Sequence, residues 1–247
     1  MIRIENVNKN YKKKQVLFDI SLNIDIHGHS IIGLIGPNGA GKTTFIKVMA
    51  GLLDYSSGKI SVDNSNSYKE WCKENVVLIP AGERGLRYKN TVYDNVMYFA
   101  AMKGVAENKV KSLMYEYASL LNYTDFLNRR VETLSMGEKK KAMLLCGLCT
   151  DMKVIIMDEP SNGLDVDARI EMEMLIKMLS TKLNKIFLIS SHDIGFLGDI
   201  AERYIFIFKG KKVAEVENAM EATEIYDKYT RLNTNLGGNN EDILKCN

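Results

Sequence analysis

Short, largely apolar runs recur along the chain, and each is long enough for a strand but too short for a helix. They cover residues 31–35, 76–79, 154–157, 186–190 and 204–208. Such runs, separated by helical segments, are typical of parallel strands buried on both faces. Pro37, Pro80 and Pro160 each follow one of these runs, where a proline marks the end of the sheet ladder. The pattern predicts a mostly parallel sheet with helices on both faces.

Near the N-terminus the pattern changes from continuous to alternating. Apolar and polar residues alternate over 1–7, 20–26 and 59–63. Alternation with a period of two indicates strands with one buried and one solvated face. We therefore expect a small antiparallel β-layer beside the parallel core.

The stretch from about 91 to 150 lacks strand signals and shows helical periodicity. Apolar side chains recur at helical spacing within 108–123, at Val110, Leu113, Tyr117, Leu120 and Leu121. A stripe of this kind indicates core packing. We expect a helical subdomain here, inserted in an α/β domain that covers residues 1–217.

The remaining residues, 218–247, are expected to form a C-terminal helical and flexible tail. A polar helical stretch follows Val216, and residues 233–240 are rich in Asn and Gly. Such polar, Gly-rich ends of chains tend to be weakly ordered.

Composition narrows the classes of protein. The 247 residues are 46% hydrophobic and 26% charged, with a net charge of +2, as in an ordinary soluble protein. This balance gives no reason to expect nucleic-acid binding. No apolar run approaches the ~20 residues that span a bilayer, and no signal pattern precedes the first strand. We expect a cytoplasmic protein, in which any membrane role requires a separate membrane subunit.

Cys146 and Cys149 form a C-x-x-C pair, which in other proteins serves redox or metal chemistry. Here the pair lies in an apolar helical stretch without a second cysteine pair or a nearby histidine. We interpret both as buried thiols of a packed helix.

The first chemical motif follows the apolar run 31–35. Residues 36–44 fit the phosphate-binding pattern G-x-x-x-x-G-K-[ST] at every fixed position. A loop between a strand and a helix directs backbone N–H groups at a phosphate, at the positive end of the helix dipole. Lys42 would contact the β- and γ-phosphates, and the Thr43 hydroxyl would hold Mg²⁺. The candidate nucleotide-binding residues are Gly36, Pro37, Asn38, Gly39, Ala40, Gly41, Lys42, Thr43 and Thr44.

The ends of two further core strands carry candidate catalytic groups. Asp158 ends the run 154–157 and suits a Mg²⁺-holding aspartate, while Glu159 is placed to polarise an attacking water. His192 follows the run 186–190, at the sheet edge where open α/β sheets bind ligands. A neutral imidazole there would contact the γ-phosphate or the water. His27 and His29 flank Gly28 and are interpreted as solvated turn residues.

Together these residues resemble the nucleotide-binding subunit of an ATP-binding cassette (ABC) transporter, over residues 2 to about 217. Residues 36–44 resemble its Walker A loop, 158–161 its Walker B strand with the catalytic glutamate, and 134–138 (Leu-Ser-Met-Gly-Glu) its signature. Residues 162–165 resemble its D-loop, and His192 its switch histidine. The resemblance implies an α/β fold of the P-loop NTPase type, with a parallel core, a flanking antiparallel β-layer and a helical subdomain.

The resemblance also implies partners and further site residues. In the family two cassettes enclose two ATP molecules head to tail, and hydrolysis drives a membrane-embedded subunit. Ser135 and Gly137 would bind the γ-phosphate held by the other subunit, Asp165 would act across the dimer, and Tyr11 would stack on adenine. The working pair is either two copies of this chain or this chain with another ABC ATPase. Localisation would be peripheral, on the cytoplasmic face of the membrane.

Two positions depart from the family pattern. Met136 replaces the first signature glycine, and we expect altered turnover with binding retained. The glutamine usual after the strand ending at Pro80 is missing, and the loop there reads Ala-Gly-Glu-Arg-Gly-Leu over 81–86. Glu83 either takes over the Mg²⁺ and water contacts or belongs to a solvated turn. Similar loops in family members paired with small export-type membrane subunits favour export weakly.

Two alternatives to a transport ATPase remain open. One is a soluble ABC-type ATPase of a non-transport machine, which the compact, single-cassette chain disfavours. The other is an ATP-binding regulatory module with little turnover, which Met136 and the missing glutamine favour and which Glu159 and His192 oppose.

Overall fold

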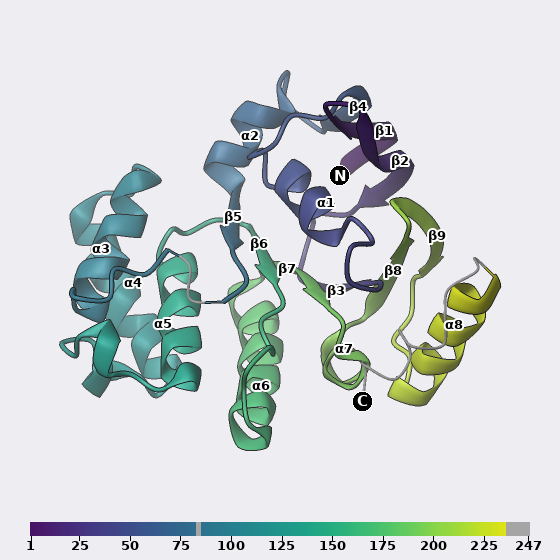
Figure 1. Ribbon diagram of the computed structural model, residues 1–247. Coiled ribbons are helices and arrows are strands. Elements are labelled where there is room, and N and C mark those ends of the chain that lie inside the picture. The colour runs from purple at the N-terminus through teal and green to yellow at the C-terminus, as the bar shows by residue number, and fades with distance from the viewer. Residues whose placement is uncertain (83–84, 236–247) are drawn as a thin grey trace.

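The computed structural model describes residues 1–82 and 85–235. The role expected for Glu83 falls outside these residues. Of the segment 233–240, which was expected to be weakly ordered, residues 236–240 also lie outside, whereas residues 233–235 end a helix, so the expectation was wrong for them. The described residues form two sheets and the helices around them (Figure 1).

The larger sheet has the strand order β5-β6-β7-β3-β8-β9. Its first five members pair in parallel, and β9 adds an antiparallel edge. The mostly parallel core is therefore confirmed, and nearly all residues of the parallel strands are buried, which explains their continuous apolar runs. The strands are β3 (Ser30–Ile35), β5 (Val76–Ile79), β6 (Val154–Asp158), β7 (Ile186–Ser191), β8 (Arg203–Phe208) and β9 (Lys211–Val216).

The smaller sheet is antiparallel, in the order β2-β1-β4, as the alternating pattern predicts. Its strands β1 (Ile2–Tyr11) and β2 (Lys14–Ile24) are longer than expected and form one hairpin, which β4 (Ser57–Val62) extends. The alternation of the hairpin is broken where β1 changes register against β2. Asn6 and Asp19 have positive φ near these irregularities, and a bulge moves side chains to the other face. That is why residues 8–19 lack a clean strand signal.

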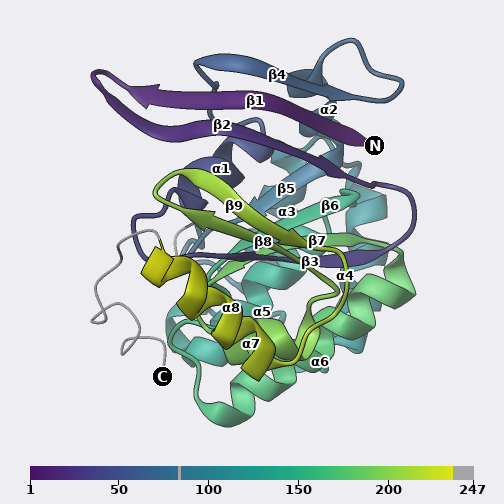
Figure 2. The same cartoon turned by 90° about the vertical axis from the view of Figure 1, so that its right-hand side faces the viewer.

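Helix α1 (Lys42–Met49) lies between the two sheets (Figure 2). One hydrophobic cluster joins its Phe45 and Ile46 to the antiparallel layer and to one face of the large sheet, through residues such as Leu17 and Leu34. A second cluster covers the opposite face of that sheet with helices α3 to α8. The phosphate loop that precedes α1 is thus fixed between two packed layers.

Three helices fill the chain between β5 and β6: α3 (Val92–Met102), α4 (Glu107–Leu120) and α5 (Met136–Leu148). Two short 3₁₀ turns, η1 (Thr124–Phe126) and η2 (Val131–Thr133), connect α4 to α5. Capping boxes begin α3 at Thr91 and α5 at Ser135. In the predicted α4 stripe Val110, Tyr117 and Leu121 are buried, so its packing role is confirmed.

Cys146 and Cys149 are both buried at the end of α5. Burial raises the pKa of the Cys149 thiol to about 12, and it raises that of Cys146 as well. Both thiols therefore stay protonated, which agrees with a packing role rather than a redox or metal site.

The remaining helices are α2 (Tyr68–Asn75), α6 (Val166–Leu183), α7 (Ile194–Ile200) and α8 (Ala222–Asn235). The polar helical stretch expected after Val216 is confirmed as α8. Neither α2 nor β9 is predicted from the sequence pattern, because both are short and mostly half-exposed or exposed. Within the described part of the chain, no helix combines the length and apolarity needed to cross a bilayer.

Candidate nucleotide-binding site

The phosphate loop connects the end of β3 to the start of α1 and depends on its glycines. Gly39 and Gly41 have φ of +78° and +103°, a region that favours glycine. A Cβ at Gly36 would lie 2.0 Å from the carbonyl oxygen of Ile207, so no side chain fits there. The Gly210 N–H also donates to the Ala40 carbonyl at 2.9 Å. These contacts hold the loop in an open curve around a cavity.

That cavity has a volume of about 320 Å³. It is lined by the phosphate loop together with the ends of β5 and β6 and one residue of β2. Its lining comprises Val16, Pro37, Asn38, Gly39, Ala40, Gly41, Lys42, Thr43, Thr44, Ala81, Asp158 and Glu159. Three separate segments of the predicted site thus meet at one edge of the parallel sheet, as expected for an open α/β fold.

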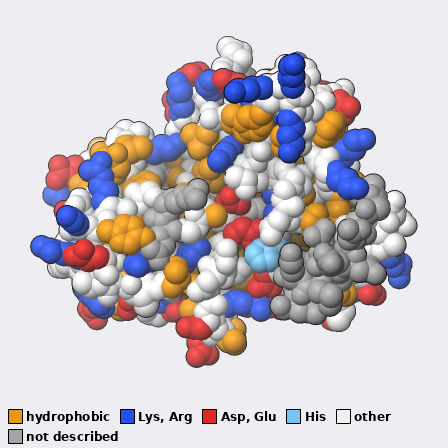
Figure 3. Space-filling view, in the orientation of Figure 1, with side chains coloured by type: hydrophobic (Ala, Val, Ile, Leu, Met, Phe, Trp, Pro, Cys, Tyr) orange, Lys and Arg blue, Asp and Glu red, His pale blue; other side chains and the backbone are white. Residues whose placement is uncertain are grey.

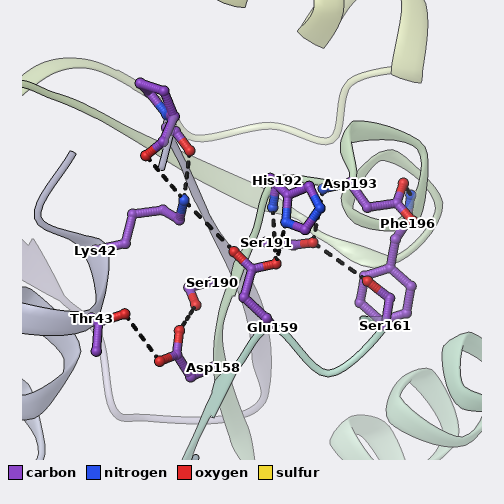
Figure 4. A network of polar contacts seen from close by, with 12 residues as sticks. Lys42, Thr43, Asp158, Glu159, Ser161, Ser190, Ser191, His192, Asp193 and Phe196 are labelled. Atoms are coloured by element: carbon purple, nitrogen blue, oxygen red, sulfur yellow. Dashed lines mark hydrogen bonds and ion pairs between the residues drawn. The ribbon is translucent and has the colours of Figure 1, made fainter. Parts of the chain in front are cut away.

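Lys42 is buried inside the loop, with 6% of its surface exposed. Its ammonium group donates to the carbonyl oxygens of Gly36 at 2.6 Å and Pro37 at 3.3 Å. It also lies 3.6 Å from a carboxylate oxygen of Glu159 (Figure 4). A buried cation at the N-terminus of a helix forms a strong binding site for a phosphate.

A hydrogen bond between Thr43 and Asp158 is the second polar contact among the residues that line the cavity. The Thr43 hydroxyl donates to one oxygen of Asp158 at 3.1 Å, and the buried Ser190 hydroxyl donates to the other at 2.5 Å. Asp158 and Ser190 are register partners of β6 and β7. Ser190 was missed by sequence reasoning, although a serine in an otherwise apolar strand is a usable signal. Both oxygens of the carboxylate are therefore oriented by hydroxyl groups (Figure 4).

This donor set fits Mg²⁺. The ion prefers oxygen ligands and is usually bound by one or two carboxylates together with substrate phosphates and water. The Thr43 hydroxyl and the Asp158 carboxylate supply hard oxygens beside the phosphate loop. Across residues 1–82 and 85–235 there is no cluster of three or more His, Cys, Asp or Glu side chains suited to a metal. An ion here would therefore depend on phosphate oxygens of the nucleotide.

Glu159 has φ of +51°, a left-handed conformation that is rare for a residue other than glycine. Glu159 directly follows β6, and its left-handed conformation turns its side chain away from that of Asp158. One Glu159 oxygen accepts from the His192 backbone N–H at 3.2 Å and lies 2.7 Å from its Nδ1. Strained backbone of this kind concentrates at functional sites. Figure 3 shows acidic side chains beside a histidine near the middle of this face.

The signature residues lie at the start of α5. Ser135 is the N-cap, and its hydroxyl accepts from the Glu138 N–H at 3.3 Å. A Cβ at Gly137 would lie 3.2 Å from that of Ala168, so a glycine allows α5 to approach α6. Met136 is 43% exposed, and its side-chain atoms lie 3.9 Å from a Cβ built on Gly163. The departure from the family pattern therefore places a flexible side chain against the chain's own D-loop.

Some predicted site residues, among them Gly36 and His192, do not line the cavity. Ser135, Gly137 and Asp165 belong to the α5–α6 surface, where Asp165 caps α6 by accepting from the Ala168 N–H at 2.8 Å. Tyr11 is 45% exposed at the end of β1, and the Lys9 ammonium lies 5.2 Å from the centre of its ring. Glu83 lies outside the described residues, although the nearby Ala81 lines the cavity.

Comparison with known proteins identifies the class that this fold and site define. The family model described as "ABC transporter" matches residues 20–162, more than half of the chain. The chain belongs to the ABC transporter family, as the motifs predict, and it is an ATP-binding cassette with an ATPase site.

Curated relatives extend this comparison. The lantibiotic transport ATP-binding protein SrtF of Streptococcus pyogenes is 32% identical over 219 residues, which cover 88% of this chain and 91% of that protein. NatA, an ABC transporter ATP-binding protein of Bacillus subtilis, is 29% identical, with 86% and 88% covered. A putative ABC transporter ATP-binding protein of Clostridium tetani is 30% identical over 87% of this chain, which spans 49% of that longer protein.

Solved structures share the fold. CbiO1 of Clostridium perfringens, described as part of the ABC transporter complex cbiONQ, superposes with a TM-score of 0.79 at 23% identity, covering 96% of this chain and 94% of that one. The cassette MJ0796, solved as a dimer bound to ADP and Pi, has a TM-score of 0.76 at 21% identity, with 88% and 98% covered. The predicted fold class, an α/β cassette with an added β-layer and helices, is confirmed.

Proposed function

We propose that this chain hydrolyses Mg²⁺-ATP in a head-to-tail dimer and thereby drives transport through a separate membrane subunit. One observation supports the proposal most strongly. Lys42 and Glu159 line the cavity and contact each other, and His192 contacts Glu159 from behind the lining, while Thr43 and Asp158 form a second contact in the cavity (Figure 4). A phosphate-binding cation, a metal-holding carboxylate and a candidate base are thus within reach of one nucleotide.

Each group has a role in this reaction. The loop residues 36–44 would bind the phosphates, with Lys42 on the β- and γ-phosphates, and Thr43 and Asp158 would hold Mg²⁺, which neutralises phosphate charge. Glu159 would accept the proton of the attacking water. His192, hydrogen-bonded to the same carboxylate, would orient Glu159 and stabilise charge on the γ-phosphate. Glu83 remains a candidate for a further contact to Mg²⁺ or water.

The dimer is proposed from the position of the signature. Ser135 and Gly137 begin a helix, and a helix N-terminus attracts an anion. These residues do not line the chain's own cavity, so the phosphate they would bind is one held by another subunit. Asp165 would act across the same interface, and Tyr11 would stack on adenine. The second subunit is either another copy of this chain or a different ABC ATPase.

The membrane partner and the location follow from the same family likeness. We propose that the chain is peripheral on the cytoplasmic face of the membrane and that it binds no nucleic acid. Residues 1–217 would form the ATPase domain, with 91–150 as the subdomain that contacts the membrane subunit, and 218–247 a C-terminal tail. The name of SrtF, a lantibiotic transport ATP-binding protein, supports a role in transport, and export is the direction we propose.

Two experiments test the proposal. The first measures phosphate release from ATP by the purified chain and by its Glu159→Gln variant. The proposal expects Mg²⁺-dependent release that the variant lacks, and equal release by both would overturn the catalytic assignment. The second recovers the tagged chain from its native cell in mild detergent and identifies partners by mass. A stoichiometric membrane protein supports transport, whereas recovery with ribosomes, DNA or nothing supports a soluble ATPase.

A further inference from the structure

Arg169 lies where the D-loop and the histidine loop approach each other. It belongs to the first turn of α6, and its backbone N–H donates to the Asp165 carbonyl at 2.9 Å. Its guanidinium group extends from α6 toward α7. This arginine is absent from the family motifs described above and has no contact with the nucleotide cavity.

Three carboxylates surround the guanidinium group. Its Nε lies 2.9 Å from Glu173 and 3.5 Å from Asp193, and its Nη2 lies 3.4 Å from Asp199. Glu173 is on α6, whereas Asp193 and Asp199 belong to the N-cap and body of α7. Burial raises the pKa of Glu173, and Arg169 opposes this while Asp199 and Asp193 add to it. Without the arginine, three negative groups would face one another across α6 and α7.

Asp193 connects this cluster to the catalytic edge. It directly follows His192, its N–H donates to the Ser191 hydroxyl at 3.0 Å, and its side chain caps α7 by accepting from the Phe196 N–H at 2.9 Å. Figure 4 shows Asp193 beside His192, whose ring contacts Glu159. The position of Asp193 therefore constrains the backbone that carries His192.

A glycine nearby gives an independent sign of this arrangement. Gly195 is the second residue of α7, in its first turn, and glycine is a weaker helix former than alanine. A Cβ there would lie 3.0 Å from Arg169 Nη2 and 3.4 Å from Asp193 Oδ1. An alanine at this position would therefore be tight against the guanidinium group, which would have to shift slightly to make room.

We propose that Arg169 is a positioning residue that links the helix after the D-loop to the histidine loop, and so holds His192 against Glu159. This inference rests on the proposed ATPase mechanism and deepens it. When the D-loop moves, α6 moves with it, and the ion pairs transmit that movement to Asp193 and then to His192. The link lies within one chain, so it acts whichever cassette is the partner.

The first test measures ATP turnover of the full-length chain with Arg169→Gln. We expect kcat to fall about tenfold, with the dissociation constant for ATP within about twofold, because a small misplacement of a catalytic group is costly. The matched control is Arg203→Gln, since Arg203 is a mostly buried arginine that also pairs with two carboxylates, Glu215 and Glu217. The control should lose stability without losing kcat, and an equal loss of kcat in both variants would overturn the inference.

A double-mutant cycle tests the route through His192. In a His192→Ala background, Arg169→Gln should lower kcat by less than about twofold, because its target is already gone. A full tenfold loss in that background would show that Arg169 acts by another route.

Gly195→Ala separates positioning from simple stability. Helix propensity predicts an unchanged or higher Tm, whereas displacement of the guanidinium group predicts a lower kcat. A variant that is both more stable and fully active would contradict the inference.

An NMR measurement, which needs no ATP turnover, distinguishes a failure of this inference from a failure of the proposed ATPase function. The chain has three histidines, so the His192 ring signals can be assigned in NMR spectra by comparison with His192→Ala. Arg169→Gln should shift the His192 signals and leave His27 and His29 in place. Arg203→Gln should shift the His27 and His29 signals and leave those of His192 in place, because Arg203 lines a cavity with His27 and His29. Unmoved His192 signals would refute the link, whereas equal turnover by wild type and Glu159→Gln would refute only the proposed reaction.

Discussion

The phosphate-loop side and the signature side of this cassette differ in how their polar groups are satisfied. On the phosphate-loop side, Lys42 and Asp158 are buried, and each contacts other groups of the same site. On the signature side, Ser135 caps its own helix, and the neighbouring Met136 is 43% exposed. The first side is organised before any ligand binds, because buried charges require partners. On the second side, Ser135 is satisfied within its own helix, and Met136 remains exposed.

This difference indicates how the two sides should respond to substitution. Changes on the organised side remove charges or donors with fixed partners, so their effects on binding and turnover should be large. Changes on the exposed side would alter contacts of the proposed dimer, so their effects should be smaller and should concern turnover more than ATP binding.

The largest effect is expected for Glu159→Gln. Loss of a general base typically lowers a rate by about 10²–10⁴, so kcat should fall by that order while ATP still binds. Phosphate release and nucleotide binding measure the two quantities separately. The control is Glu132→Gln, an exposed carboxylate next to the signature, which should keep normal turnover.

Lys42→Ala should weaken ATP binding itself. A hydrogen bond to a charged group contributes roughly 1.5–3 kcal/mol, which corresponds to about 10- to 100-fold in the dissociation constant. Titration calorimetry or a fluorescent ATP analogue would measure it. Lys47→Ala, an exposed lysine of the same helix, is the matched control, and equal affinities for all three proteins would remove Lys42 from the site.

Ser190→Ala should raise the Mg²⁺ concentration that gives half-maximal turnover by about tenfold. The change removes the donor that orients Asp158, and losing such a supporting hydrogen bond typically costs 10- to 100-fold in metal affinity. Ser180→Ala removes an equally buried hydroxyl that donates to the Lys185 carbonyl, away from the site. If both variants need the same Mg²⁺ concentration as wild type, the Ser190 contact has no role in metal binding.

Tyr11→Ala tests a residue at the margin of the organised side. Stacking of an aromatic ring on a base contributes roughly 1–3 kcal/mol, so the dissociation constant for ATP should rise at least about fivefold. Nucleotide-binding titration measures this constant, with Tyr115→Ala on α4 as an exposed tyrosine control. An unaltered affinity for ATP would exclude a stacking role for Tyr11.

The smallest effect is expected on the signature side. Met136→Gly restores the family residue and removes the side chain that lies against the D-loop. We expect kcat to rise about threefold as the loop gains room, with ATP affinity unchanged. A change in ATP affinity without a change in kcat would mean that the signature side contributes to nucleotide binding, which contradicts the comparison.

Local motifs made much of the site predictable. The phosphate loop, Asp158 and Glu159 follow from short patterns at the ends of apolar runs, and Ser135 was placed correctly at a helix start. The position of His192 at the same sheet edge follows from the rule for open α/β sheets. The contacts of Ser190 with Asp158 and of Arg169 with α7 were not predicted, because each joins residues about 30 positions apart through register or helix packing.

The sequence alone determined the chemistry of this protein: the buried strands of its core, the glycines of the phosphate loop and the identity of its charged side chains. Those features depend on local propensities and on motifs of a few residues. Tertiary structure alone decided which groups touch. It set the register that places Ser190 beside Asp158, the left-handed turn that places Glu159 beside His192, and the helix packing that surrounds Arg169 with carboxylates. These contacts require distant segments to pack together, and packing depends on the whole core.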